Sequence, residues 1–161
     1  MPVFARTARP WHRLLPEAVN YALAIALAVL ATLAAGAAGA SPAQDYMLYC
    51  MGCHGPEAQG VTGKIPPLAG ALPLYMRTAA GRDYVLRVPG AANSVLTDAQ
   101  LAAVLNWLAI TYPAPGEQHA TPFTAAEVTG TRHTPLANVL ATRQVVVQEL
   151  AAAGAAPAST Y

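Results

Sequence analysis

The sequence predicts an all-α protein, and three observations support that fold class. Between residues 101 and 108, apolar side chains recur at positions i, i+3, i+4 and i+7, which is the spacing of one helix face. Capping-box patterns, in which Ser or Thr precedes Gln or Glu by three residues, predict helix starts at residues 41, 97 and 124. The 12 glycines and 14 prolines indicate loops between such segments.

Composition and charge narrow the functional classes. The chain has 161 residues, of which 55% are hydrophobic and 11% charged, whereas a disordered chain would be polar and highly charged. A formal net charge of +1 gives no reason to expect a nucleic-acid binder. Two cysteines are too few for a disulfide-dense scaffold. The length allows one modest domain with additional segments.

Residues 1–40 have the pattern of a secretory signal peptide. Basic side chains precede residue 14, and 17 of the 20 residues from 21 to 40 are hydrophobic and none is charged. The segment ends in the small residues Ala38-Gly39-Ala40, which predicts cleavage before Ser41. The alternative is an uncleaved membrane anchor over residues 21–40. In both interpretations the rest of the chain is exported. We therefore expect a periplasmic protein that is either free or anchored to the inner membrane.

The first element after this leader is a helix that runs into a cysteine motif. Ser41 caps it and Pro42 occupies its first position, so we expect the helix to continue through Tyr49. It leads into the sequence Cys50-Met51-Gly52-Cys53-His54, and C-x-x-C-H is the attachment pattern of c-type haem. The two thiols can form thioethers with the two porphyrin vinyl groups, and the adjacent imidazole can ligate the iron.

Three other interpretations of this motif were compared with haem attachment. A thioredoxin-like redox pair lies near a βαβ pattern, which the sequence lacks. A zinc site needs a second pair of ligands, but there is no further cysteine, and His119 and His133 lie far downstream. A disulfide between Cys50 and Cys53 is possible after export. The motif and the leader together favour one covalently attached haem c per chain.

The next elements are a short helix around residues 75–86 and a longer one that opens at the second capping box. The longer helix starts at Thr97, carries Trp107 beside its apolar stripe, and ends near residues 111–112, before Pro113. The region between the motif and these helices is rich in Gly and Pro.

Residues 41–112 therefore resemble a class I cytochrome c domain of the exported bacterial type. The resemblance implies an all-α fold around one haem, in which a loop proline carbonyl accepts a hydrogen bond from the proximal His54. Pro66, in Ile65-Pro66-Pro67-Leu68, occupies that place, although these prolines could instead only stiffen the loop. The family's first and last helices also cross. The equivalent contact would join Tyr46 or Tyr49 to Trp107 or Leu108.

The expected distal ligand departs from the family pattern. Family members carry a methionine just before the last helix, but residues 90–96 contain none. Met76, the one methionine after His54, is our candidate distal ligand, since Met/His ligation is known in cytochromes c. A buried core position is the alternative for Met76. The distal position would then be taken by Asn93, another weak ligand, His119 or His133, or it would stay open.

Residues 113–161 form an extension beyond the expected domain. A break at residues 113–116 is followed by the third capping box and by helical periodicity from Pro135 to Ala153, with Gly154 as a C-cap. Residues 155–161 are expected to be disordered, and His119 and His133 to be exposed. The long helix could pack on the haem domain or dock a partner such as a dehydrogenase.

Together these patterns predict a haem c electron-transfer protein that is not an enzyme. It would shuttle single electrons between redox partners, namely a dehydrogenase, an oxidase or another cytochrome, and would not bind nucleic acid. One alternative is a gas- or peroxide-binding haem protein or enzyme with an open distal site. Another is an accessory cytochrome subunit of a larger oxidoreductase.

Overall fold

The structure is a computed structural model that describes residues 14–34, 39–114, 116 and 120–155. The chain divides into two units, residues 1–39 and 40–161. In the first unit, α1 spans Leu14–Ala34. Within the described residues, no helix combines the length and the apolar character required to cross a membrane. Residues 1–13 and 35–38 lie outside the described part, so the basic region and part of the cleavage pattern do too, and export stays a prediction.

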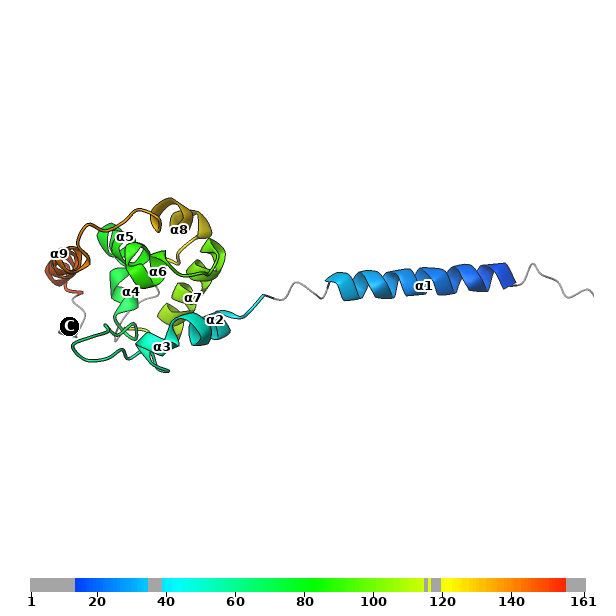
Figure 1. The fold of residues 1–161 in the computed structure, drawn as a ribbon, viewed down its shortest axis with the longest axis horizontal. Coiled ribbons are helices and arrows are strands. Elements are labelled where there is room, and N and C mark those ends of the chain that lie inside the picture. The colour runs from blue at the N-terminus through cyan, green and yellow to red at the C-terminus, as the bar shows by residue number, and fades with distance from the viewer. Residues whose placement is uncertain (1–13, 35–38, 115, 117–119, 156–161) are drawn as a thin grey trace, which may run out of the picture. The chain divides into compact units, whose positions relative to one another are not determined.

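Every named secondary-structure element among the described residues of the second unit is a helix, which confirms the all-α fold class (Figure 1). The only β-type pairing among these residues is an isolated bridge between Val61 and Ile65. The helices are α2 (Pro42–Tyr49), α3 (Met51–His54), α4 (Leu72–Tyr75), α5 (Ala79–Arg87), α6 (Pro89–Ala92), α7 (Asp98–Thr111), α8 (Ala125–Thr131) and α9 (Val139–Ala152).

The longer helices α2, α5, α7, α8 and α9 begin where a side chain caps them. Ser41 and Thr97 each form the complete capping box at the starts of α2 and α7. Thr124 accepts a hydrogen bond from the backbone N–H of Glu127 at the start of α8, so all three expected starts are confirmed. The last helix begins at Val139 rather than at Pro135, because the Asn138 side chain caps it at the Ala141 N–H.

The single short helix expected around residues 75–86 is in fact two. Helix α4 ends at Tyr75, and α5 starts at Ala79 after Thr78, whose hydroxyl accepts a hydrogen bond from the Gly81 N–H at 3.0 Å. Gly81 allows the two helices to approach closely, since a Cβ on it would lie 2.1 Å from the Tyr75 carbonyl oxygen. This close approach lets α4 and α5 pack as one unit.

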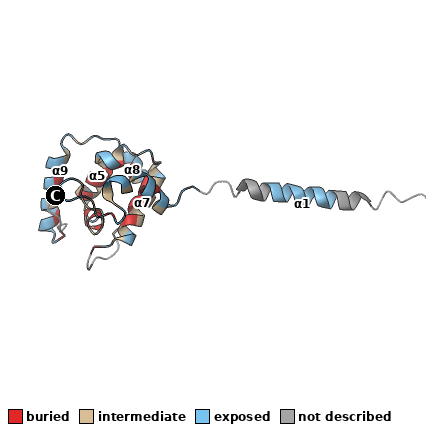
Figure 2. Cartoon of the chain, turned by 60° about the horizontal axis from the view of Figure 1, so that its bottom comes forward, coloured by how far each residue is buried: buried red, intermediate tan, exposed pale blue. Residues whose placement is uncertain are grey.

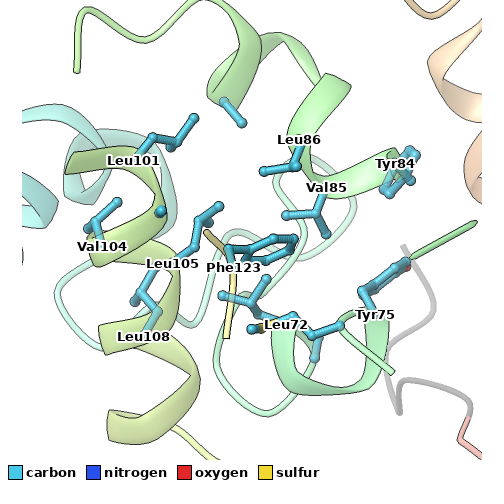
Figure 3. Packing of buried hydrophobic residues seen from close by; sticks show 14 of the residues in the cluster. Leu72, Tyr75, Tyr84, Val85, Leu86, Leu101, Val104, Leu105, Leu108 and Phe123 are labelled. Atoms are coloured by element: carbon cyan, nitrogen blue, oxygen red, sulfur yellow. The ribbon is translucent and has the colours of Figure 1, made fainter. Parts of the chain in front are cut away.

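The core is shared between the expected domain and the extension. Buried side chains from α4, α5 and α7 converge, and Phe123 from the extension lies among them (Figure 3). Val128 of α8 and Leu150 of α9 are also fully buried, so both helices contribute to the core, although much of their surface is exposed (Figure 2). The extension therefore packs on the domain, which is one of the two roles predicted for it. The other role, docking of a partner, stays a prediction.

Arginine side chains fasten the extension to the domain. The Arg82 guanidinium of α5 bonds both carboxylate oxygens of Glu127, at 2.7 and 2.6 Å, and lies 4.3 Å from the centre of the Phe123 ring. Arg87 donates to the backbone carbonyls of Thr134 and Pro135 at 2.8 and 3.0 Å. Bidentate geometry makes the Arg82 pair stronger and more specific than a single contact.

Arg132, at the end of α8, connects the extension to the loop before α7. Its guanidinium donates to the carbonyls of Ser94 and Leu96, both at 2.9 Å, and pairs with Asp98 at 3.0 Å. Asp98 also accepts a hydrogen bond from Thr129. Arg132 is buried, and these acceptors compensate for the loss of hydration at its two terminal nitrogens, while its buried Nε has no hydrogen-bond partner. The loop before α7 is thereby fixed by a residue of the extension.

We expect Arg132→Ala to lower the free energy of unfolding by about 2 kcal/mol or more, because it leaves two carbonyls and Asp98 without a charged donor. The matched control is Arg87→Ala, which also removes two backbone contacts but at a more exposed site, and its cost should be below about 1 kcal/mol. The side chains of Arg132 and Arg87 are 8% and 21% exposed. Equal losses in urea unfolding would contradict this account.

The Arg82–Glu127 pair should make stability depend on pH. The hydrogen bond from Arg82 lowers the pKa of Glu127 although burial opposes this, so the pair stabilises the fold above the ordinary pKa of glutamate. This contribution is lost as the pH falls through the lowered pKa. The stability gap between the wild type and Glu127→Gln should be largest at neutral pH and shrink in acid, as measured by urea unfolding. Glu149→Gln, at an exposed position of α9, should show no such gap.

Candidate functional site

The Cys50–His54 motif lies where α2 passes into the single turn of α3. Cys50 donates its N–H to the Tyr46 carbonyl at 2.9 Å, and its own carbonyl accepts from the His54 N–H at 3.0 Å. The two cysteines are three positions apart in this turn, so they lie on neighbouring positions of one helical surface. Both are free thiols; Cys50 is half-buried and Cys53 is exposed. The backbone thus presents both thiols and the imidazole from one short segment.

An aromatic contact between α2 and α7 holds the motif on the domain. The ring centres of Tyr46 and Trp107 are 5.7 Å apart, and the Tyr46 hydroxyl donates to the Gly55 carbonyl at 2.5 Å. Tyr112 packs edge-on against Trp107 at 6.3 Å. The predicted contact between the two helices is therefore confirmed, with Tyr46 as its member. Tyr49, the other candidate, is 50% exposed.

The His54 ring is oriented by the loop that follows it. Its Nδ1 lies 3.1 Å from the Pro66 carbonyl oxygen. When Nδ1 carries the proton and donates it to this carbonyl, Nε2 keeps its lone pair and can ligate a metal. The contact implied by the resemblance is present, and the part it plays with a cofactor stays a prediction.

Gly60 sets the position of the Pro66 carbonyl, and the sequence reasoning missed it. Its N–H donates to the His54 carbonyl at 2.8 Å, and its φ of +68° lies in the left-handed region, which glycine adopts most easily. A Cβ on Gly60 would lie 2.3 Å from the Ile65 oxygen and 2.8 Å from the Pro66 oxygen. The available signal was a glycine in a Pro-rich loop, which is too common to single out one position.

Burial shifts the pKa values of His54 and Cys50 in opposite directions. It lowers the pKa of His54, an effect that the Pro66 carbonyl partly opposes, so neutral imidazole is favoured. Neutral imidazole is the form that binds metals. Burial, with a smaller effect from Asp45, raises the pKa of the Cys50 thiol. Reactive redox cysteines instead have a lowered pKa, so this shift opposes the thioredoxin-like interpretation.

The donor set fits a covalently held haem. Two thiols and one neutral imidazole on a single turn are what thioether attachment with one axial ligand requires. Next to Cys50, the large apolar residues Met47, Leu48 and Tyr49 are all exposed, so unburied apolar surface lies beside the thiols. In the described part of the chain, no three or more His, Cys, Asp or Glu side chains gather as a metal-ion site would need.

Met76 has different surroundings from the motif. It caps the C-terminus of α4, belongs to the apolar core, and is 3% exposed. It lines a small hollow, the other members of which are Asn106, Ala109, Ile110, Ala120 and Pro122. Met76 as distal ligand stays a prediction.

The other distal candidates are scattered or undescribed. Asn93 is the exposed C-cap of α6, and His133 is exposed, as the sequence predicted. His119 lies outside the described residues. The tail from residue 156 also lies outside them, and Ala155, the first residue expected to be disordered, is instead buried.

Comparison with known proteins gives no relative on which to rest an assignment. The chain matches no protein-family model and no curated protein.

We expect Gly60→Ala to disturb the His54 contact and to cost more stability than Gly63→Ala. Both glycines have positive φ, so each alanine should cost about 1–2 kcal/mol from the backbone alone. Only at Gly60 does the added Cβ meet backbone oxygens, since nothing lies within 4 Å of it at Gly63. Urea unfolding measures the two losses, and the NMR shift of His54 Nδ1 should move only in Gly60→Ala. Equal behaviour of the two variants would refute the role given to Gly60.

Proposed function

We propose that this chain is an exported, class I cytochrome c-like protein that carries one covalent haem c and transfers single electrons. The observation that carries the proposal is the C-x-x-C-H turn with His54 Nδ1 at the Pro66 carbonyl. The motif alone is compatible with haem, zinc, a redox pair or a disulfide. The oriented imidazole favours an axial ligand, because a hydrogen-bonded Nδ1–H fixes the ring and raises its basicity.

The two cysteines and the histidine of the motif each have a defined role in this proposal. Cys50 and Cys53 would hold the porphyrin by thioether bonds, since each S–H can add across one vinyl double bond without any oxidant. His54 offers Nε2 to the iron while Pro66 holds its other nitrogen. When bound, haem c supplies an iron that alternates between the ferrous and ferric states. The contact between Tyr46 and Trp107 keeps this segment rigid.

Electron transfer, rather than catalysis, agrees best with the exposure of the site. Cys53 is exposed, so the porphyrin edge bound to it would lie near the surface, where a redox partner can approach. A dehydrogenase, an oxidase or another cytochrome would serve as partner, and an accessory role in a larger oxidoreductase uses the same edge.

Covalent attachment is tested by exporting the full chain in cells that make c-type cytochromes. The mass of the purified protein should increase by one haem, and the pyridine haemochrome spectrum should be that of haem with two saturated vinyl groups. Cys50→Ser with Cys53→Ser should lose covalent haem, while each single variant should give a spectrum with one vinyl group left.

The matched control is Ser94→Ala, a hydroxyl change outside the motif, which should keep full haem content. Absence of haem from the wild type, or covalent haem in the double variant, would contradict the proposal. A zinc-loaded wild type without haem would favour the metal-site interpretation.

A further inference from the structure

We propose that the backbone of Ala58 is what positions the Pro66 carbonyl at His54 Nδ1, by closing the loop that follows the cysteine turn. This loop comprises residues 55–69. Ala58 is then a positioning residue, since it acts on the imidazole through Pro66 and does not touch the ring itself. The inference deepens the proposed function, and its importance for iron ligation rests on that function. The contacts that carry it belong to this chain alone.

Ala58 has a backbone conformation that alanine seldom adopts. Its φ is +54°, in the left-handed region, and every other described residue with such a φ is a glycine. Its methyl group belongs to the apolar core and is 0% exposed. A residue remains in such a conformation only where the surrounding contacts determine it, and these residues cluster at functional sites. The contacts of Ala58 therefore indicate what the conformation serves.

The backbone groups of Ala58 join the two ends of the loop. Its N–H donates to the Gly55 carbonyl at 3.2 Å. Its carbonyl accepts two hydrogen bonds, from the N–H groups of Leu68 and Ala69 at 2.8 and 3.0 Å. The start of the loop, directly after the cysteine turn, is thus bonded to its end through a single residue.

The two prolines of the loop depend on anchors outside themselves. Pro66 and Pro67 have no backbone N–H, so neither can donate a hydrogen bond that would fix its own position. Before them, Ile65 is held by two hydrogen bonds with Val61, at 2.8 and 2.9 Å. After them, the next two N–H groups both bond to Ala58. The Pro66 carbonyl is therefore held from one side by Val61 and from the other by Ala58.

These hydrogen bonds depend on the left-handed conformation of Ala58. A change of φ to a negative value rotates the adjoining peptide planes, so the N–H and the carbonyl of this residue would not both keep their partners. Glycine adopts positive φ freely, whereas a β-branched residue does so only as an outlier. Position 58 should therefore accept glycine and reject valine. Its role differs from that of Gly60, which leaves room for the Pro66 carbonyl but does not bond the segment after it.

The test compares Ala58→Val, Ala58→Gly and Ala102→Val in the exported full chain. Ala102 is the matched control, since it is also a buried core alanine but lies within α7. NMR measures the exchange of the His54 Nδ1–H with solvent, which the hydrogen bond to Pro66 slows. Ala58→Val should speed this exchange about tenfold, as the loss of one hydrogen bond implies, and the other two variants should exchange like the wild type. Wild-type exchange in a folded Ala58→Val, or fast exchange in Ala58→Gly, would overturn the inference.

A second measurement needs no variant and decides the question even where Ala58→Val does not fold. In the wild type, the amides of Leu68 and Ala69 and the His54 Nδ1–H should exchange through one common opening, with the same dependence on low concentrations of urea. Different dependences would show that Pro66 is held independently of Ala58 and would refute the inference.

Haem content is measured first in every sample, so that the two proposals are tested separately. A lack of covalent haem counts against the proposed function. The exchange of the Nδ1–H reports on the contact between His54 and Pro66 with or without haem, so its result counts for or against the role of Ala58 alone.

Discussion

The crossing of α2 and α7 through Tyr46 is the contact on which the arrangement of the motif depends. Tyr46 is buried against Trp107 and at the same time bonds the Gly55 carbonyl directly after His54. One side chain thus joins α7 to the end of the cysteine turn. The loop that carries Pro66 then closes back on His54 through Gly60. Loss of the Tyr46 contact would leave the turn as a short helix, which has little stability of its own.

How much of this could be read from the sequence depended on how local the determining interactions are. The capping boxes at Ser41 and Thr97 act within four residues, so their sequence pattern was sufficient to predict the starts of α2 and α7. The contacts of Tyr46 and Pro66 followed from a family resemblance rather than from local pattern. The need for a glycine at position 60 could not be predicted, because it arises from the approach of Ile65 and Pro66 in three dimensions.

The arginine contacts lay beyond sequence reasoning for the same reason. Arg82 and Glu127 are 45 residues apart, and Arg132 and Leu96 are 36 apart. An arginine in a helix is ordinarily read as a solvated charge, and nothing in its neighbours shows that it will bind backbone carbonyls elsewhere. The chain has few charged residues, and these arginines bind groups of distant segments and so hold those segments together. The extension is consequently an integral part of the second unit, although the resemblance ended at residue 112.

The late position of the extension in the chain also bears on the order of assembly. A chain that emerges N-terminus first presents residues 50–54 well before residues 121–135, which the guanidinium groups of Arg82 and Arg87 require as acceptors. Until then, α4 and α5 lack residues 121–135, which pack against them. The packing of the second unit is therefore incomplete. Contacts of such long sequence separation form late, since the intervening loop must first be ordered. The cysteine turn is therefore synthesised well before the C-terminal segment can complete the packing of α4 and α5.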